Sequence, residues 1–387
     1  MFNRVLRQLF ERKKASALLS ISQDGARFCH AQALRTALES ERIVRHNAAR
    51  LVPPFRMSDQ TDNIRPPHAP ESSWAQRLLG DFHVTGLFWY RLHRWAVEKV
   101  PEPLLAPLVG FFTSCFFCFI HKIRNAIGAN LDVVLGPAGW LKRQRRIWRT
   151  MYSFAWCLTE RYERLVTDRT FQVECEAMEH WHAVANSGRG FVMVTAHLGL
   201  YEVGSMLPAG TETPHVHLVR EPEIDPRAQA FIEESVAAVE SAHYTMHFQT
   251  GDPLFALTLA QALERGEVVA IQGDRPRTGG KTVQTELFGR PFTLPVGPAV
   301  LSRAAGVPMI PVFAIREGRR RFRLVFRPPI ETPRTRNRDE DLRAATTQLA
   351  RELEYGIRRA PYQWFVFRAL WRNGSIGAGE KGTDLSA

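Results

Sequence analysis

The sequence predicts an α/β fold in which a layered mixed sheet is flanked by helices and preceded by membrane-associated helices. After Arg189, short apolar and β-prone runs alternate with helical patterns, as they do in layered α/β domains. Before that residue, the stretch from Trp74 to Arg161 is helical in pattern and dense in aromatic and basic side chains. The 387 residues are 45% hydrophobic, which is enough for a folded chain with one main domain and extensions.

The chain divides by composition into an extension, a main domain and a tail. Residues 1–75 form the predicted extension and end in a Pro-rich linker, because proline lacks an amide proton and restricts the residue before it. The main domain is expected at 76–372, and the Gly-rich residues 373–387 are expected to be disordered. The basic start of the chain lacks an apolar core and a cleavage site, so we expect no secretory signal and a cytoplasmic location.

The helical part of the main domain, about 80–165, contains the most hydrophobic stretch, Leu104 to Ile120. This stretch has roughly 17 residues, the lower limit for crossing a bilayer, and we interpret it as membrane-embedded or interfacial. A buried core helix is the alternative. Tryptophans and basic residues around it suit the headgroup layer, although a solvated basic face above an ordinary core would look the same. Cys115 and Cys118 lie inside the stretch, where packing explains them better than redox or metal chemistry.

The α/β part, about 170–372, is expected to alternate strands with helices. Short apolar, β-prone runs predict the strands, and apolar residues at helical spacing predict the helices. The expected elements are, in order, a strand at Phe191 to Ala196, a strand ending at Arg220, helices at Arg227 to Ala242 and Asp252 to Arg265, a strand at Val268 to Ile271, a helix from near Val296 to before Gly306, a strand at Met309 to Ile315, a basic turn at Arg316 to Arg321, a strand at Phe322 to Phe326 and a helix from about Asp339 to Arg358.

The net charge of +12 requires a negatively charged partner. Nucleic acid, an anionic membrane or a phosphorylated substrate would each satisfy it. No nucleic-acid-binding module is recognised in the sequence, which argues against the first. The five cysteines are an odd number at irregular positions, which favours a reducing compartment over a disulfide framework.

The sharpest local feature is His197-Leu198-Gly199-Leu200-Tyr201-Glu202, directly after an expected strand. Residues five apart diverge on a regular helix, so His197 must precede the following helix, and Gly199 can turn the chain. Glu202 would then reach back to one ring nitrogen while the other faces a cleft. An imidazole oriented in this way is a candidate general base, because its pKa lies near neutrality. The alternative is a histidine that merely caps the helix.

Two arginines and a helix start could complete a site around that histidine. Arg220 and Arg275 each lie at the carboxyl end of an expected strand, where open α/β sheets usually bind ligands. Arginine suits phosphate because its planar fork donates two hydrogen bonds, although each could instead form a surface ion pair. The expected helix start near Val296 and Gly297 presents backbone amides that could stabilise an oxyanion.

Three competing motifs fail. Gly279-Gly280-Lys281-Thr282 resembles the end of a phosphate-binding P-loop, but the required first glycine would fall at Arg275. His243 and His247 have the spacing of helical metal ligands but lack further ligands nearby, so we predict no metal. The nucleophile elbow of serine hydrolases, G-x-S-x-G, is absent.

Taken together, these residues resemble the lysophospholipid acyltransferase superfamily, and more closely the lipid A biosynthesis lauroyl and myristoyl acyltransferases. The resemblance extends from about Asp81 to Trp371 and follows the family's order. Its blocks are His197 to Glu202, the His-x4-Glu signature, then Val219 to Glu221, Phe288 to Pro291 leading into Gly297, Val307 to Phe313, and Pro361 to Arg368.

The resemblance implies a glycerolipid acyltransferase-like fold and an enzyme that needs no cofactor and forms no covalent acyl-enzyme. It implies His197 as the base that activates an acceptor hydroxyl, Glu202 as its orienting partner, and Arg220 as a contact to phosphate. It also implies an acyl carrier protein as donor and the cytoplasmic face of the bacterial inner membrane as location. Residues 1–75 have no counterpart in the family that we recognise, and the apolar stretch lies after the linker instead of at the chain start.

The leading hypothesis is therefore transfer of an acyl chain to a hydroxyl of a lipid or glycolipid at an anionic membrane surface. Three alternatives stay open. The first is an acyltransferase that uses acyl coenzyme A and a lysophospholipid. The second is a non-catalytic membrane-binding protein with the same fold, and the third, argued only by charge and aromatic content, is a nucleic-acid binder.

Overall fold

The structure, a computed structural model, describes 87–167, 169–200, 214–222, 229–230, 233, 244–249, 254–276 and 280–371. The predicted extension at 1–75 and the predicted tail at 373–387 lie outside these residues, and so does most of the helix expected at Arg227 to Ala242. Those assignments stay predictions.

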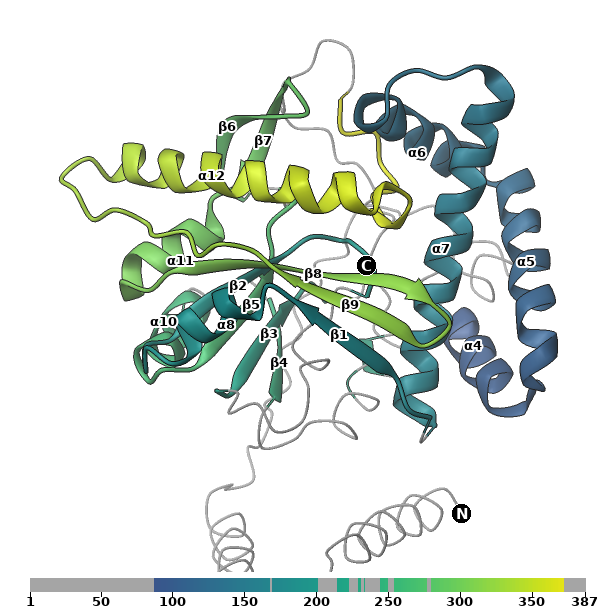
Figure 1. The fold of residues 1–387 in the computed structure, drawn as a ribbon, viewed down its shortest axis with the longest axis horizontal. Coiled ribbons are helices and arrows are strands. Elements are labelled where there is room, and N and C mark those ends of the chain that lie inside the picture. Colours follow the sequence, from purple (N-terminus) through teal and green to yellow (C-terminus); the bar gives the residue numbers. More distant parts are fainter. Residues whose placement is uncertain are drawn as a thin grey trace, which may run out of the picture. The chain divides into compact units, whose positions relative to one another are not determined.

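Four helices form the first described part of the chain and lie together beside the sheet (Figure 1). They are α4 (Leu87–Lys99), α5 (Glu102–Phe119), α6 (His121–Val134) and α7 (Trp140–Val166). Ile127 and Ile147 bury their side chains between α6 and α7, in a core that Phe365 and Phe367 from the end of the chain complete. The described chain is thus helical from Leu87 to Val166 apart from short connections, and the last described segment packs against these helices.

The sheet has seven strands in the order β1-β9-β8-β2-β5-β3-β4. Strands β2, β5, β3 and β4 are parallel, β8 is parallel to β2, and β9 runs antiparallel to β8. The sheet is therefore mixed and mostly parallel, which confirms the expected fold class. The strands are β1 (Gln172–Glu176), β2 (Phe191–Thr195), β3 (Val216–Arg220), β4 (Tyr244–Phe248), β5 (Val268–Gln272), β8 (Met309–Gly318) and β9 (Arg321–Phe326).

Helices cover both faces of the sheet, which explains why β2 is buried at every position and apolar at all but its last, Thr195. Val192 and Val194 face the core beneath α10 (Phe255–Glu264), α11 (Gly297–Ala305) and α12 (Arg338–Arg359). Phe191 and Met193 face the opposite core, which Trp181 of α8 (Met178–Ala185) closes. Successive side chains of a strand point to opposite faces, so a continuous apolar run is what two buried faces require.

Several elements were not expected from the sequence. The largest is the hairpin of β6 (Thr282–Leu287) and β7 (Arg290–Pro295), in a region interpreted only as a close approach and a helix start. Its turn uses Phe288 and Gly289, both at positive φ. Exposed and half-buried residues alternate along most of β6, and most of them are polar. No hydrophobic run therefore marks this strand in the sequence. β1, α8 and β4 were also missed, and the basic turn is shorter than predicted because β8 extends to Gly318.

An acidic pair in α7 fixes the helical part to the turn between β8 and β9. Glu160 and Glu163 are fully buried. Nε of Arg316 donates to Oε2 of Glu160 at 2.7 Å, and Nη2 of Arg319 donates to Oε1 of Glu163 at 2.8 Å. Burial alone would raise the pKa of Glu163, but the hydrogen bonds from Arg319, Arg320 and Arg169 outweigh it and lower the pKa to about 2. Glu163 is therefore a buried, ionised anchor.

Replacing Glu163 with alanine should lower the free energy of unfolding by about 3 kcal/mol, the low end of the cost of breaking a buried ion pair, because the arginines left behind reach solvent. Urea denaturation followed by circular dichroism measures this. The matched control is Glu98→Ala, which removes the exposed i,i+4 pair with Arg94 and should cost no more than about 0.5 kcal/mol. Equal costs for the two variants would contradict the assignment of Glu163 as an anchor.

Candidate active site

The segment after β2 holds His197 in a fixed backbone position. The amide of His197 donates to Oδ2 of Asp274 at 3.1 Å, and its carbonyl accepts from the amide of Phe365 at 2.7 Å. Gly199 follows at φ 60° and donates its amide to the carbonyl of Gln363 at 2.9 Å. The histidine is therefore set by contacts from two distant parts of the chain, and only 8% of its surface is exposed.

Asp274 is the carboxylate that orients the imidazole in the described structure. Nδ1 of His197 lies 2.7 Å from Oδ1 of Asp274, and Nε1 of Trp364 donates to Oδ2 at 2.9 Å. The geometry follows from strand register, because β2 and β5 pair with Thr195 opposite Gln272. His197 and Asp274 each lie two residues beyond that pair, on adjacent parallel strands.

The pair is buried, and its surroundings favour an uncharged imidazole beside an ionised carboxylate. Burial lowers the pKa of His197, and the Arg275 guanidinium lowers it further against the opposing effects of Asp274 and Glu221. Burial would raise the pKa of Asp274, but His197, Arg275 and the Trp364 hydrogen bond outweigh it and lower the pKa to about 2. At neutral pH the imidazole is therefore uncharged and the carboxylate ionised, as a general base with an orienting partner requires.

The lowered pKa of His197 gives a pH prediction. The neutral imidazole should persist below the ordinary histidine pKa of about 6.5, so the acid limb of a kcat/KM profile should fall below that value. Arg275→Gln removes a cation that lowers the pKa, so it should move the acid limb to higher pH. Measuring kcat/KM against pH for both proteins tests this. An acid limb that stays in place, or moves to lower pH, would contradict it.

A cavity of about 310 Å³ opens beside His197 at the carboxyl ends of β2, β3 and β5. Parallel strands usually present their ligand sites at this edge. Three of the predicted residues, Arg220, Arg275 and Gly297, line the cavity together with His197. Lys281, which the sequence analysis discounted as part of a P-loop, also lines it. Three cationic side chains against the single carboxylate of Glu221 make the cavity suited to a phosphorylated ligand.

The start of α11 forms one wall of this cavity. The amide of Val296 donates to the carbonyl of Lys281 at 3.1 Å, so it is engaged within the protein. The first helical bond runs from the amide of Val300 to the carbonyl of Val296. The amide of Gly297 therefore lies before the first hydrogen bond within the helix. Amides at this position of a helix are the ones that bind anions.

Sequence reasoning placed Glu202 beside His197, but Glu202 lies outside the described residues and its role stays a prediction. Asp274 was not selected, although it follows an apolar strand at the same offset as His197. That shared offset is the available signal. It identifies the pair only when β2 and β5 are known to be neighbours, and 77 residues separate the two side chains along the chain.

Gly199 offers a test of how tightly the histidine segment is held. A Cβ at this position would lie 1.9 Å from the carbonyl oxygen of Ala314, and the positive φ adds strain. Gly199→Ala should therefore displace His197 and lower activity at least tenfold. Gly188→Ala is the matched control, because its φ is 67° but nothing lies within 4 Å of the added Cβ. It should cost about 1 kcal/mol in unfolding free energy and leave turnover unchanged. Full activity in Gly199→Ala would contradict this account.

A buried histidine and aspartate beside a basic cavity, at the carboxyl edge of a mostly parallel sheet, form an arrangement that can activate a nucleophile by removing its proton. The chain belongs to the bacterial lipid A biosynthesis acyltransferase family, whose model matches residues 77–373. The protein is thus an acyltransferase of lipid biosynthesis, and the family predicted from the sequence is confirmed.

The chain is also similar to characterised proteins. It is 25% identical over 302 residues to the phosphatidylinositol mannoside acyltransferase of Mycobacterium tuberculosis, covering 74% of this chain and 89% of that one. The protein of the same name from Mycolicibacterium smegmatis is 24% identical over 202 residues, covering 52% of this chain and 62% of the other. A crystal structure of the 1-acyl-sn-glycerophosphate acyltransferase from Thermotoga maritima aligns with 64% of this chain and 94% of its own, with 14% identity and a TM-score of 0.29.

Proposed function

We propose that the protein transfers a fatty acyl chain from an acyl thioester to a hydroxyl of a lipid or glycolipid at the cytoplasmic face of a bacterial inner membrane. The observation that carries the proposal is the hydrogen bond from Nδ1 of His197 to buried Asp274, beside a basic cavity. The bond fixes the ring so that Nε2 serves as the base. Membership of an acyltransferase family supplies the reaction type.

The reaction needs one proton transfer and one displacement at a carbonyl. Nε2 of His197 takes the proton from the acceptor hydroxyl while the oxygen of that hydroxyl attacks the carbonyl carbon of the thioester. The tetrahedral intermediate collapses, the C–S bond breaks, and the proton passes to the departing thiolate, so an ester and a free thiol are formed. No covalent acyl-enzyme is required. Asp274 stabilises the transient imidazolium, since its carboxylate is ionised and in direct contact.

The cavity walls suggest how the substrates are held. Arg220, Arg275 and Lys281 would contact phosphate on the acceptor or on the phosphopantetheine arm of the donor. The amide of Gly297 would face the oxyanion that develops on the thioester carbonyl. Glu202, next to this site in sequence, is retained as a second candidate partner for His197.

The donor and the acceptor class follow from charge and from the relatives. An acyl carrier protein is the proposed donor, because these carriers are acidic and this chain carries a net charge of +12. Acyl coenzyme A is the alternative. The family description names lipid A, and the relatives are named for phosphatidylinositol mannosides. Both are glycolipids, so a sugar hydroxyl of an anionic glycolipid is the favoured acceptor, with a lysophospholipid as the alternative.

The test is an acyl-transfer assay with the full-length purified protein in lipid nanodiscs. Labelled acyl carrier protein and labelled acyl coenzyme A are each offered with a bacterial lipid extract, and mass spectrometry identifies the lipid that gains an acyl chain. We expect a glycolipid to gain one chain from the carrier-bound donor. Transfer from acyl coenzyme A alone would replace the proposed donor. Transfer to a lysophospholipid would replace the proposed acceptor. No transfer from either donor would overturn the proposed reaction.

A further inference from the structure

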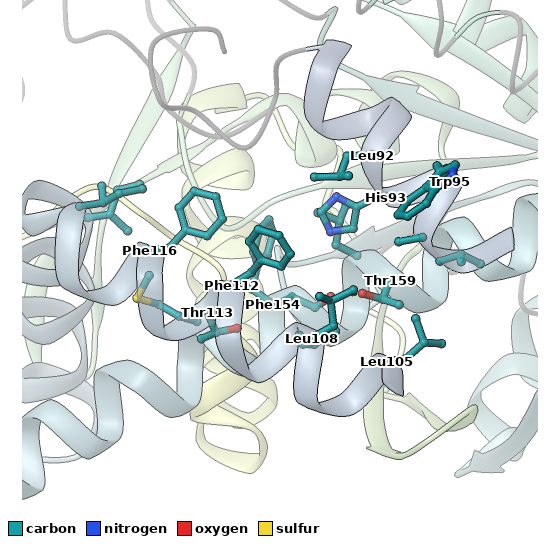
Figure 2. A pocket seen from close by; sticks show the side chains of 18 of the residues that line it. Leu92, His93, Trp95, Leu105, Leu108, Phe112, Thr113, Phe116, Phe154 and Thr159 are labelled. Atoms are coloured by element: carbon teal, nitrogen blue, oxygen red, sulfur yellow. Dashed lines mark hydrogen bonds between the residues drawn. The ribbon is translucent and has the colours of Figure 1, made fainter. Parts of the chain in front are cut away.

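A second cavity, of about 220 Å³, lies between α4, α5 and α7 (Figure 2). Its lining is hydrocarbon and aromatic almost throughout. Polar side chains are limited to His93, Thr113 and Thr159, and the hydroxyl of Thr159 donates to the carbonyl of Ala155 in its own helix. One water needs only ~10–15 Å³ but also two to four polar partners. The space is therefore large enough for many waters and chemically unsuited to them, which points to an apolar occupant.

The cavity reaches the protein surface, because Trp95 in its wall is 55% exposed. The outer face of α5 is also apolar and exposed, with Phe111 at 63% and Phe119 at 75%. Trp140, at the start of α7, is 75% exposed. Isolated exposed apolar residues are ordinary, but a group of large ones on adjacent helices marks an interaction surface.

Helix α5 is the one described helix that is long and apolar enough to cross a membrane, yet its packing favours lying along the surface. Glu102 at its start lies 2.6 Å from Nη2 of Arg320 and 3.9 Å from Nη1 of Arg169. Farther along, Ser114 accepts from Nε1 of Trp148 in α7 at 3.2 Å. Spanning would carry the buried glutamates and the arginines of α7 into hydrocarbon, at a cost of several kcal/mol for each charge.

Basic side chains are exposed on the helices next to α5. Arg91 and Lys99 are exposed on α4, and Lys122 is exposed near the start of α6. Arg145 and Arg149 are exposed on α7. Each basic residue near an anionic leaflet adds to the attraction between the protein and the membrane. An apolar face bordered by cations is the pattern of a protein that lies in the headgroup layer of an anionic membrane.

The cavity is separated from the catalytic histidine by an aromatic wall. Phe154 packs edge-on against Phe365 and Phe367, with ring centroids 5.2 Å and 4.9 Å apart. Among the described residues, Phe154 also lines a small space of about 20 Å³ on the side of Gly199 and Leu200. The thioester carbonyl at His197 is therefore not continuous with this cavity. Its occupant must enter from the surface side, where the membrane-facing residues lie.

We propose that this cavity takes up one hydrocarbon tail of a phospholipid from the membrane leaflet, which anchors the protein in the interface without α5 crossing the bilayer. The lipid is a bound anchor and not a substrate. Burial of the tail methylenes stabilises the bound lipid, and the exposed cations on the neighbouring helices attract its phosphate. The inference does not depend on acyl transfer, because lipid uptake is measured without turnover.

The test uses vesicles of phosphatidylethanolamine and phosphatidylglycerol that contain a phosphatidylglycerol with a diazirine at the end of one tail. After illumination, peptide mass spectrometry locates the label on the full-length protein. We expect label in α5 and α7, on cavity residues such as Phe112 and Leu158. Ala155→Phe fills the cavity and should lower this label at least tenfold. Ala106→Phe, the same change at an exposed position of α5, should keep it.

A second variant covers failure of Ala155→Phe to fold. Leu108→Gln adds one amide to the half-exposed wall and should also lower the label, with unchanged circular dichroism. Equal labelling of the cavity peptides in all variants would overturn the proposal. So would displacement of the label by excess non-hydrolysable acyl thioether, since the cavity would then hold the donor chain. Absence of label from these peptides in the unmodified protein would mean that another part of the chain fills the cavity, and would overturn it too.

Discussion

His197→Ala is expected to lower the turnover number for acyl transfer by roughly 10²- to 10⁴-fold, the contribution of a positioned general base. The imidazole is the only group that the described structure places both against a buried carboxylate and on the wall of the basic cavity. Without it, the acceptor hydroxyl must lose its proton to water. The measurement is the rate of labelled acyl transfer by purified protein in nanodiscs at saturating donor.

The control for this variant is His182→Ala, which removes an exposed histidine of α8 that does not line the cavity. It should leave the rate unchanged. Binding of His197→Ala to anionic vesicles should also be unchanged, because the proposed anchoring surface is formed by α4, α5 and α7. Full turnover in His197→Ala would remove the catalytic assignment and favour a non-catalytic membrane-binding role. Loss of vesicle binding together with turnover would mean that the variant had unfolded.

The sequence was sufficient for features that depend on local pattern. The apolar run at Phe191 to Ala196 marked a buried strand, and the turn residue Gly199 marked the end of it; the structure has both. Arg220 and Arg275 were selected because each lies at the carboxyl end of an expected strand, and the carboxyl ends of parallel strands share one edge; both line the cavity beside His197.

Features that depend on strand order could not be predicted from local sequence pattern. Nothing local shows that β5 pairs with β2 instead of directly with β8, yet that neighbour relation brings Asp274 to His197. The contact from Trp364 likewise needs the last described segment to return to the end of β2, which only the folded core determines. The β6 and β7 hairpin was missed for a different reason, because its alternation is too weakly apolar to stand out.

Asp274→Asn is the second change expected to have a large effect, a loss of roughly 10³- to 10⁴-fold in turnover with the fold retained. The reason lies in which oxygen accepts which bonds. Oδ2 of Asp274 accepts from both the amide of His197 and Nε1 of Trp364, whereas Oδ1 faces Nδ1 of His197. An asparagine must keep its oxygen at the position with two donors.

Its amide nitrogen then faces Nδ1 of His197 and donates to it, which places the ring proton on Nε2. That tautomer cannot accept a proton from the acceptor hydroxyl, so Asp274 acts as a positioning residue through its charge and its acceptor geometry. Trp364→Phe, which removes one of the two donors to Oδ2, should restore part of the activity of Asp274→Asn, because the asparagine can then turn its oxygen toward Nδ1 at lower cost. Glu202→Gln is the comparison that separates the two candidate partners. If Asp274→Asn retained turnover while Glu202→Gln lost it, Glu202 would be the orienting carboxylate and the pairing described here would be wrong.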